Sequence, residues 1–117
     1  METRLLPAFD VERDAANIRA AAEALLAGLV VAFPTETVYG LGARADSPKA
    51  LELLKKIKGR PEDKPFAILV PSAQAAKLYA PHLPPAFHRL AGRFWPGPLT
   101  IVVPDGAGGT VGLRCPA

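Results

Sequence analysis

Apolar residues follow two different spacings along the chain, which predict helices and strands in alternation. In some segments they recur every three or four positions, as in an amphipathic helix, whereas other segments are short, nearly continuous apolar runs typical of strands. The predicted helices cover residues 10–27, 48–58, 73–78 and 85–94. The predicted strands cover residues 29–33, 66–70, 99–103 and 110–114. This alternation, without an internal repeat, predicts a single layered domain of the α/β or α+β class.

Several residues mark where the predicted helices begin and end. Gly28 stands where a helix commonly ends in a left-handed residue. Ser47 followed by Pro48 is a favourable start for the second helix, which ends before Gly59. The last helix has to end before Pro96, because proline cannot continue a helix.

The composition is that of an ordinary globular protein. Half of the 117 residues are hydrophobic and 21% are charged, and the length fits one domain spanning residues 1–117. The net charge of +3 is compatible with a polyanionic ligand but does not require one. Because Cys115 is the single cysteine and no signal-peptide pattern opens the chain, we expect a cytoplasmic protein. No apolar run approaches the roughly 20 residues that cross a bilayer, so we expect no membrane role.

Polar side chains follow the first predicted strand in the segment FPTETVYGLG, residues 33–42. A buried strand leads directly into hydroxyl groups, one carboxylate and two glycines. Loops at strand ends commonly hold the binding sites of α/β proteins, and glycine lets a backbone approach a ligand closely. The alternative is a turn whose Thr and Glu side chains bond to their own backbone. The residues alone leave both interpretations open.

Three cations, Lys58, Arg60 and Lys64, lie in a proline-containing segment between a predicted helix and a predicted strand. Like charges this close repel one another unless an anion lies among them. A triphosphate suits such a site, because Arg binds phosphate bidentately and Lys acts as a point charge. A solvated helix end followed by a loop is the alternative.

Two further residues stand out near the C-terminal strands. Trp95 lies between a predicted helix and two prolines, where packing in the core is the expected role. Arg114 interrupts an apolar strand. A buried arginine needs an anionic partner, which can be an Asp or Glu of the protein or a carboxylate or phosphate of a ligand.

Four segments, PTETVYGLG, KGRP, WPGPLT and TVGLRCP, occur in the order found in the YrdC/Sua5 family. Between residues 29 and 116 the chain therefore resembles that family. The resemblance implies an α/β fold with a twisted mixed sheet, flanking helices and a concave basic cavity. It also implies the activity of a nucleotidyltransferase, L-threonylcarbamoyladenylate synthase. That enzyme converts threonine, bicarbonate or CO2, and ATP into threonylcarbamoyl-AMP and pyrophosphate for the t6A modification of tRNA.

The resemblance assigns one group of residues to the substrate threonine. Thr37 resembles a threonine contact of the family, and Thr35, Glu36 and Tyr39 shape the same wall. Arg114 resembles the family's ligand for the threonine carboxylate.

A second group is assigned by the resemblance to ATP. Lys58 and Arg60 resemble the family's Lys-x-Arg pair at the phosphates, and we expect them to be the catalytic residues because they neutralise charge. Lys64 and Thr110 resemble further ATP contacts. Mg²⁺ is expected to arrive with ATP, and no residue of the chain is predicted to be a metal ligand.

Two departures from the family pattern bear on subtype and completeness. Leu69 stands where longer Sua5-type members carry a histidine that touches threonine, which favours the shorter YrdC subtype. The Ser-x-Asn motif of the family's active site is missing, so we expect the chain to be C-terminally incomplete and inactive alone. Cys115, His82 and His88 match no functional position and are expected to be structural or surface residues.

Two other functions remain as alternatives. A YrdC-like module also occurs in the HypF-type carbamoyltransferase, but the segments that precede it there are missing before residue 1. A module that binds double-stranded RNA or tRNA without catalysis is the second alternative. By family analogy, the partner that receives the adenylate is a TsaD-containing t6A complex.

Overall fold

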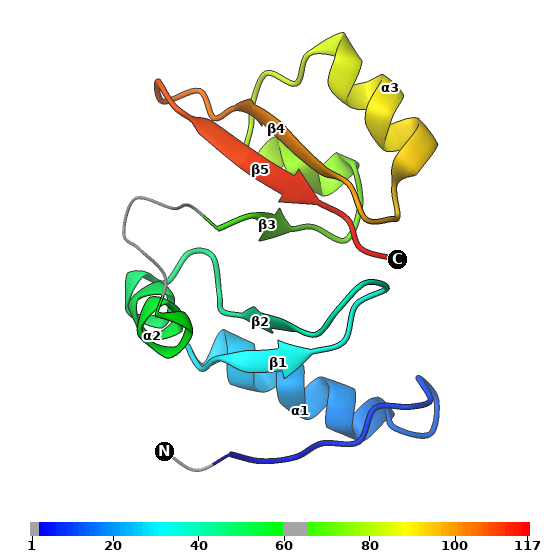
Figure 1. The fold of residues 1–117 in the computed structure, drawn as a ribbon, viewed down its shortest axis with the longest axis vertical. Coiled ribbons are helices and arrows are strands. Elements are labelled where there is room, and N and C mark those ends of the chain that lie inside the picture. The colour runs from blue at the N-terminus through cyan, green and yellow to red at the C-terminus, as the bar shows by residue number, and fades with distance from the viewer. Residues whose placement is uncertain (1–2, 60–65) are drawn as a thin grey trace. The chain divides into compact units, whose positions relative to one another are not determined.

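Helices and strands, in ones and twos, follow one another along the chain (Figure 1). The structure is a computed structural model that describes residues 3–59 and 66–117. By their contacts these residues form two units. Unit 1 comprises residues 3–33 and 40–59, and unit 2 comprises residues 34–39 and 66–117. The segment 34–39 therefore belongs to unit 2, although its neighbours in the chain on both sides belong to unit 1.

Unit 1 contains two helices and a short antiparallel strand pair. Its elements are α1 (Ala15–Leu26), β1 (Val31–Phe33), β2 (Gly40–Gly42) and α2 (Pro48–Lys58). In the strand pair Val31 lies opposite Gly42 and Phe33 lies opposite Gly40. The sequence predicted a strand at residues 29–33 that is buried on both faces, but β1 is shorter and none of its residues is fully buried.

The ends of α2 lie where the sequence predicted them. The side chain of Ser47 accepts a hydrogen bond from the backbone N–H of Ala50 at 3.2 Å, and Pro48 is the first helical residue. At the other end Gly59 has a φ of 64°, in the left-handed region that glycine adopts without strain. These local signals mark where the helix begins and ends.

The start of α1 differs from the prediction, because the helix begins at Ala15 and not at residue 10. Two aspartates bond to nearby backbone groups instead. Asp14 accepts from the N–H groups of Phe9 and Asp10 at 2.8 and 3.1 Å. The Asp10 side chain accepts from the N–H groups of Glu12 and Arg13, both at 2.9 Å. Such side-chain bonds offer the backbone an alternative to the helix. The N–H of Asp10, together with Arg13 and Phe9, lowers the pKa of Asp14.

Strand β2 was not predicted, and its Gly42 makes room for Phe33 of β1. A Cβ atom at Gly42 would lie 2.6 Å from Cε1 of Phe33, which is closer than side chains approach one another. The sequence indicated that Gly42 allows close approach of a ligand, whereas the structure shows close approach of the Phe33 ring.

Unit 2 is built on a three-stranded mixed sheet. Its elements are β3 (Ile68–Leu69), the 3₁₀ helix η1 (Gln74–Leu78), α3 (Pro85–Phe94), β4 (Thr100–Pro104) and β5 (Thr110–Arg114). The strand order is β3-β5-β4, with β3 parallel and β4 antiparallel to β5. The mixed sheet with flanking helices confirms the predicted α/β class. No helix in the described part of the chain is long and apolar enough to cross a membrane.

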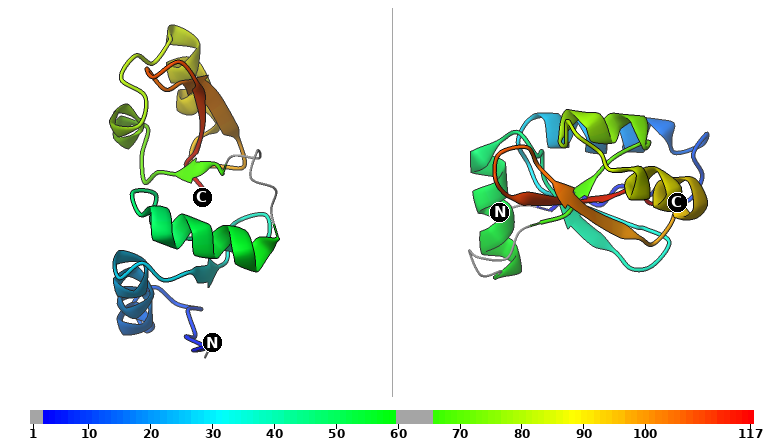
Figure 2. Two further views of the ribbon diagram at one scale, coloured as in Figure 1. Left: turned by 90° about the vertical axis from the view of Figure 1, so that its left-hand side faces the viewer. Right: turned by 90° about the horizontal axis from the view of Figure 1, so that it is seen from above.

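The hydrophobic core of unit 2 lies between one face of this sheet and the helices η1 and α3 (Figure 2). Its fully buried members are Val70, Ala76, Ala80, Phe87, Ala91, Ile101, Val103, Leu113 and Cys115. Trp95 packs against this core, with its ring 5.4 Å from that of Phe87 in an edge-to-face contact, and its Nε1 donates to the carbonyl of Leu99 at 2.8 Å. The predicted packing role of Trp95 is therefore confirmed.

Candidate functional site

The side chain of Arg114, at the end of β5, contacts the segment 34–39. Its Nη2 donates to Oε1 of Glu36 at 2.6 Å and to Oγ1 of Thr37 at 3.3 Å. The other carboxylate oxygen of Glu36 accepts from the backbone N–H of Ala117 at 3.2 Å. Residues 78 positions apart in the sequence thus meet within unit 2.

The two threonines of this segment extend the contact into a chain of hydrogen bonds. The Thr35 hydroxyl lies 2.5 Å from the carbonyl of Val38, so its one proton is used there. In the 3.1 Å contact between the two hydroxyls, Thr37 therefore donates and Thr35 accepts. The bonds run in one direction, from Arg114 to Thr37, then to Thr35 and to the carbonyl of Val38. Thr37 has spent its proton and can only accept a further hydrogen bond from a ligand.

The anionic partner of Arg114 is the carboxylate of Glu36. The side chains of Arg114 and Glu36 are only 21% and 20% exposed, so water screens this ion pair less than a pair on the surface. The hydrogen bond from Arg114 is the largest cause that lowers the pKa of Glu36, which keeps the carboxylate ionised. Within the described residues, Nε of Arg114 is buried and has no hydrogen-bond partner.

Thr110 and Arg114 lie on the same face of β5, because side chains alternate along a strand. Gly112 lies between them on that face and carries no side chain. The core residue Leu113 points to the opposite face, where it is fully buried. Thr110 itself is exposed, as is Tyr39 at the end of the segment 34–39.

The residues predicted to bind ATP lie in different parts of the chain. Lys58 is the last residue of α2 in unit 1, and Lys55 and Lys56 share its helical turn. Cations at this end of a helix are favourable, since the helix dipole is negative there. Arg60 and Lys64 lie outside the described residues. The convergence of Lys58, Arg60 and Lys64 with the Arg114 group in one site stays a prediction.

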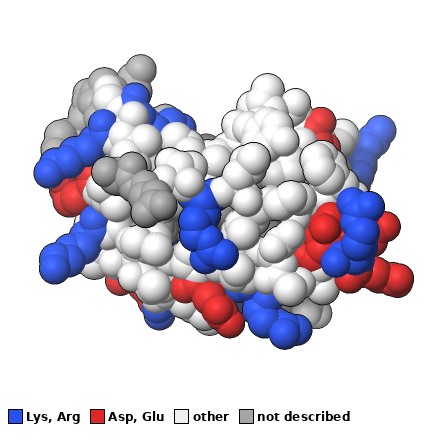
Figure 3. Space-filling model, turned by 90° about the horizontal axis from the view of Figure 1, so that it is seen from below, with Lys and Arg blue, Asp and Glu red and all other residues white. Residues whose placement is uncertain are grey.

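Charged residues are spread over the face drawn in Figure 3, with Asp and Glu side chains near several of the Lys and Arg side chains. The predicted concave basic cavity stays a prediction. In residues 3–59 and 66–117 there is no group of three or more His, Cys, Asp or Glu side chains that could hold a metal ion.

A family model for Sua5, YciO and YrdC proteins, described as telomere recombination, matches residues 23–117. The matched region includes both segments that form the Arg114 contacts. The chain belongs to the Sua5/YciO/YrdC family.

Curated relatives of the chain carry the name threonylcarbamoyl-AMP synthase. The protein of Pyrococcus abyssi is 45% identical over 110 residues, which are 86% of this chain and 32% of the relative. That of Bacillus subtilis is 41% identical over 88 residues, 75% of this chain and 25% of the relative. The chain thus spans a quarter to a third of the length of these two proteins.

Solved structures of the family share the fold. The crystal structure of P. abyssi Sua5 complexed with L-threonine matches with a TM-score of 0.82 and 43% identity over 87% of this chain and 33% of that chain. Escherichia coli YciO matches with a TM-score of 0.73 over 86% of this chain and 53% of that chain. Because its identity is 24%, this second likeness speaks only for the fold.

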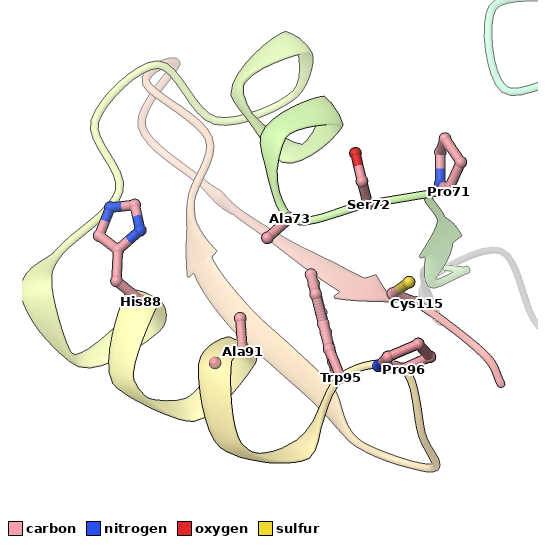
Figure 4. Close-up of a pocket in the computed structure, with 9 residues that line it drawn as sticks. Pro71, Ser72, Ala73, His88, Ala91, Trp95, Pro96 and Cys115 are labelled. Atoms are coloured by element: carbon pink, nitrogen blue, oxygen red, sulfur yellow. The ribbon is translucent and has the colours of Figure 1, made fainter.

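Unit 2 also contains a cavity of about 400 Å³ on the core side of the sheet (Figure 4). Ser72 and Ala73 line it from the segment before η1, His88 and Trp95 from α3 and its end, and Cys115 from the end of β5. Cys115 follows Arg114 directly and therefore faces the other side of the strand. None of the described residues that the family resemblance assigns to substrates lines this cavity.

The family resemblance placed Glu36 on the same wall of the threonine site as Thr37, but we did not predict Glu36 as a binding residue. Two signals were available. A buried Arg114 needs an anionic partner. Glu36 is the only acidic residue of the polar segment 33–42, which also contains Thr37 and Tyr39. The sequence alone does not show the tertiary contact that brings residues 36 and 114 together.

Proposed function

We propose that the chain is part of a threonylcarbamoyl-AMP synthase, which forms threonylcarbamoyl-AMP and pyrophosphate from threonine, bicarbonate or CO2, and ATP. The observation that carries the proposal is the contact of Arg114 with Glu36 and Thr37, which lie on the family's PTETVYGLG segment. Relatives that share this region are named for the activity, and one solved relative was crystallised with L-threonine.

On the threonine side, the chain offers donors and acceptors that match an amino acid. The guanidinium of Arg114 can donate to the substrate carboxylate, the strongest kind of hydrogen bond available to that group. Thr37 can accept from the ammonium or hydroxyl group of threonine, because its own proton is bonded to Thr35. We assign Thr35 and Tyr39 to the same wall of the threonine site.

On the ATP side, Lys58, Arg60, Lys64 and Thr110 are the proposed contacts. The threonine amine adds CO2 to give N-carboxythreonine, and the new carboxylate attacks the α-phosphorus of ATP while pyrophosphate leaves. No protein nucleophile is needed, so Lys58 and Arg60 would act by positioning the triphosphate and neutralising its charge. Mg²⁺ bound to ATP would supply further charge neutralisation as part of the substrate.

The product would serve t6A modification of tRNA, with a TsaD-containing complex as the next partner and the cytoplasm as the expected location. A purely RNA-binding module and a HypF-type carbamoyltransferase module were the alternatives. The names of the curated relatives favour neither of them.

The threonine site can be tested by calorimetric titration of the 117-residue chain with L-threonine. We expect saturable binding that falls by roughly 10-fold or more in Arg114→Gln, since a charged hydrogen bond to the carboxylate is lost. Arg89→Gln on α3 makes the same change in charge and should leave the affinity unchanged. Equal threonine affinity in wild type and Arg114→Gln would contradict the assignment of Arg114, and absence of binding by the wild-type chain would contradict the site.

A further inference from the structure

Glu36 uses its two carboxylate oxygens on two different parts of the chain. Oε1 accepts from the guanidinium of Arg114, and Oε2 accepts from the backbone N–H of Ala117, three residues further on. A carboxylate that merely neutralised the arginine would be expected to bond it with both oxygens, in the bidentate geometry that such pairs favour. Glu36 instead connects the segment 34–39 to two groups at once, the guanidinium of Arg114 and the backbone N–H of Ala117.

We propose that Glu36 is a positioning residue for Arg114, which fixes the direction of the guanidinium so that the N–H groups of Nη1 are ready for the carboxylate of the substrate. This inference rests on the proposed threonine site. It assigns to Glu36 no contact with the substrate itself.

The hydrogen bonds of Arg114 support this role over that of a competing anion. Nη2 has two protons, and one is given to Glu36 and the other to Thr37. The bonds found within the described residues thus all leave from this one nitrogen, and the other nitrogens of the fork are not used by Glu36. A carboxylate that took a whole edge of the guanidinium would bond two of its nitrogens, whereas Glu36 takes one N–H of Nη2. Because both protons of Nη2 are used and Nε is buried, the two N–H groups of Nη1 are the ones left for a ligand among the described contacts.

The direction of the Thr37 hydroxyl depends on the same arrangement. Thr37 accepts from Arg114 and donates to Thr35, so a guanidinium that turned away would release the Thr37 oxygen as well. Glu36 then positions two of the proposed threonine contacts through one ion pair. Its loss should weaken threonine binding, even though it removes a negative charge that repels the substrate carboxylate.

The sign of the affinity change in Glu36→Gln decides between positioning and competition. Gln keeps the size and one oxygen acceptor but loses the charge, and its amide cannot bond both Arg114 and the N–H of Ala117 through oxygens. We expect threonine affinity to fall by roughly 10-fold, the factor that corresponds to ordering one long side chain on binding. Glu52→Gln on α2 makes the same charge change at an exposed side chain and serves as the matched control.

A second measurement follows Arg114 without any ligand. Nitrogen NMR of the guanidinium should show slow rotation of the Arg114 Nη groups in the wild-type chain and in Glu52→Gln, and fast rotation in Glu36→Gln. This readout separates the inference from the proposed function. If the wild-type chain does not bind threonine, the proposed function is wrong, and the rotation alone decides whether Glu36 positions Arg114.

Three results would overturn the inference. One is unchanged or tighter threonine binding by Glu36→Gln, which would make Glu36 a bystander or a competitor. Another is equal rotation of the Arg114 guanidinium with and without Glu36. The last is fast rotation in the wild type, which can be measured even if Glu36→Gln does not fold.

Discussion

The two units differ in what stabilises them. Unit 2 has a hydrophobic core with members from its sheet, η1 and α3, whereas the buried residues of unit 1 within the described chain are Asp14, Ala50 and Leu54. The contacts described for unit 1 are mostly local. They are the caps of α2, the hydrogen bonds of Asp10 and Asp14, and the packing of Phe33 on Gly42. The segment 34–39 joins the unit with the core, and polar contacts to Arg114 fix it there.

Two arginine-carboxylate pairs, one in each unit, also differ in sequence separation and in exposure. Arg44 and Asp46 of unit 1 are two positions apart and 42% and 68% exposed, whereas Arg114 and Glu36 of unit 2 are 78 positions apart and about 20% exposed. A local pair orders little of the chain, and water screens it. A distant pair closes a long loop, so its formation depends on the folded core and its loss releases a segment of the proposed site.

Truncation of Phe87 should have the largest effect, because this ring is 1% exposed and lies at the centre of the unit 2 core. We expect Phe87→Ala to lower the free energy of unfolding of unit 2 by about 3 to 5 kcal/mol. Trp95 is the one tryptophan of the chain, so its fluorescence in a urea titration follows unit 2. Phe94→Ala, on the same helix with a side chain 47% exposed, should change the free energy by less than about 1 kcal/mol.

A comparable loss in Phe94→Ala and Phe87→Ala would show that unit 2 is not organised around Phe87. The two substitutions remove the same group from the same helix, so differences in helix propensity cancel between them.

Addition of one methyl group at Gly42 should have a smaller effect, confined to unit 1. A Cβ there meets Cε1 of Phe33 at 2.6 Å, so the ring or the strand has to shift, at a cost of about 1 to 3 kcal/mol. Hydrogen exchange measured by NMR should become faster across residues 31–42 in Gly42→Ala. The control is Gly92→Ala in α3, where a Cβ has nothing within 4 Å and should stabilise the helix by up to about 1 kcal/mol.

Exchange that is unchanged at residues 31–42 in Gly42→Ala would remove the packing explanation for this glycine. Close approach of a ligand would then be the remaining explanation for a glycine at position 42.

Features fixed by neighbouring residues could be predicted from the sequence. The cap at Ser47, the glycine at 59 and the end of α3 before Pro96 all depend on a few adjacent residues, and the structure has them as predicted. Strand β5 also has its predicted bounds, because its apolar run lies between a glycine-rich turn and a proline. The role of Trp95 followed from the same kind of local signal.

Features that depend on distant contacts could not be predicted. Strand β2 has the sequence Gly-Leu-Gly, which has no strand propensity of its own, and it forms because it pairs with β1. The sequence showed that Arg114 needs an anion but left open whether protein or ligand supplies it. Glu36 answers that question only after the sheet and the segment 34–39 have come together.

Acid should break the Arg114 pair before it breaks the core. The pKa of Glu36 is lowered from its ordinary value of 4.5 by the hydrogen bond from Arg114, so the ion pair adds stability above that pH. This contribution is lost as the pH falls from about 4.5 through the lower pKa of the folded state. The urea midpoint of unit 2, read from Trp95, should be higher in wild type than in Glu36→Gln at neutral pH.

The difference between these two midpoints should vanish in acid, where Glu36 is protonated. The backbone N–H groups of Ala107 and Gly109 also lower the pKa of Asp105 in unit 2, but this group is the same in both proteins. A midpoint difference that persists unchanged at acid pH would mean that the charge of Glu36 does not contribute to stability.

The smallest effect is expected from Asp46→Asn, which breaks the local pair of unit 1. Arg44 also donates to the carbonyl of Leu26 at 3.0 Å, near the C-terminal end of α1, and this bond does not need Asp46. Both side chains of the pair reach solvent, so water and salt replace the lost contact at little cost. Hydrogen exchange at the end of α1 and the start of α2 should therefore change less in Asp46→Asn than exchange at residues 35–38 changes in Glu36→Gln. Addition of 1 M salt should reduce the effect of Asp46→Asn further, because the screening length then falls to about 3 Å. If Asp46→Asn were the more disruptive substitution, sequence separation and exposure would not be what distinguishes the two pairs.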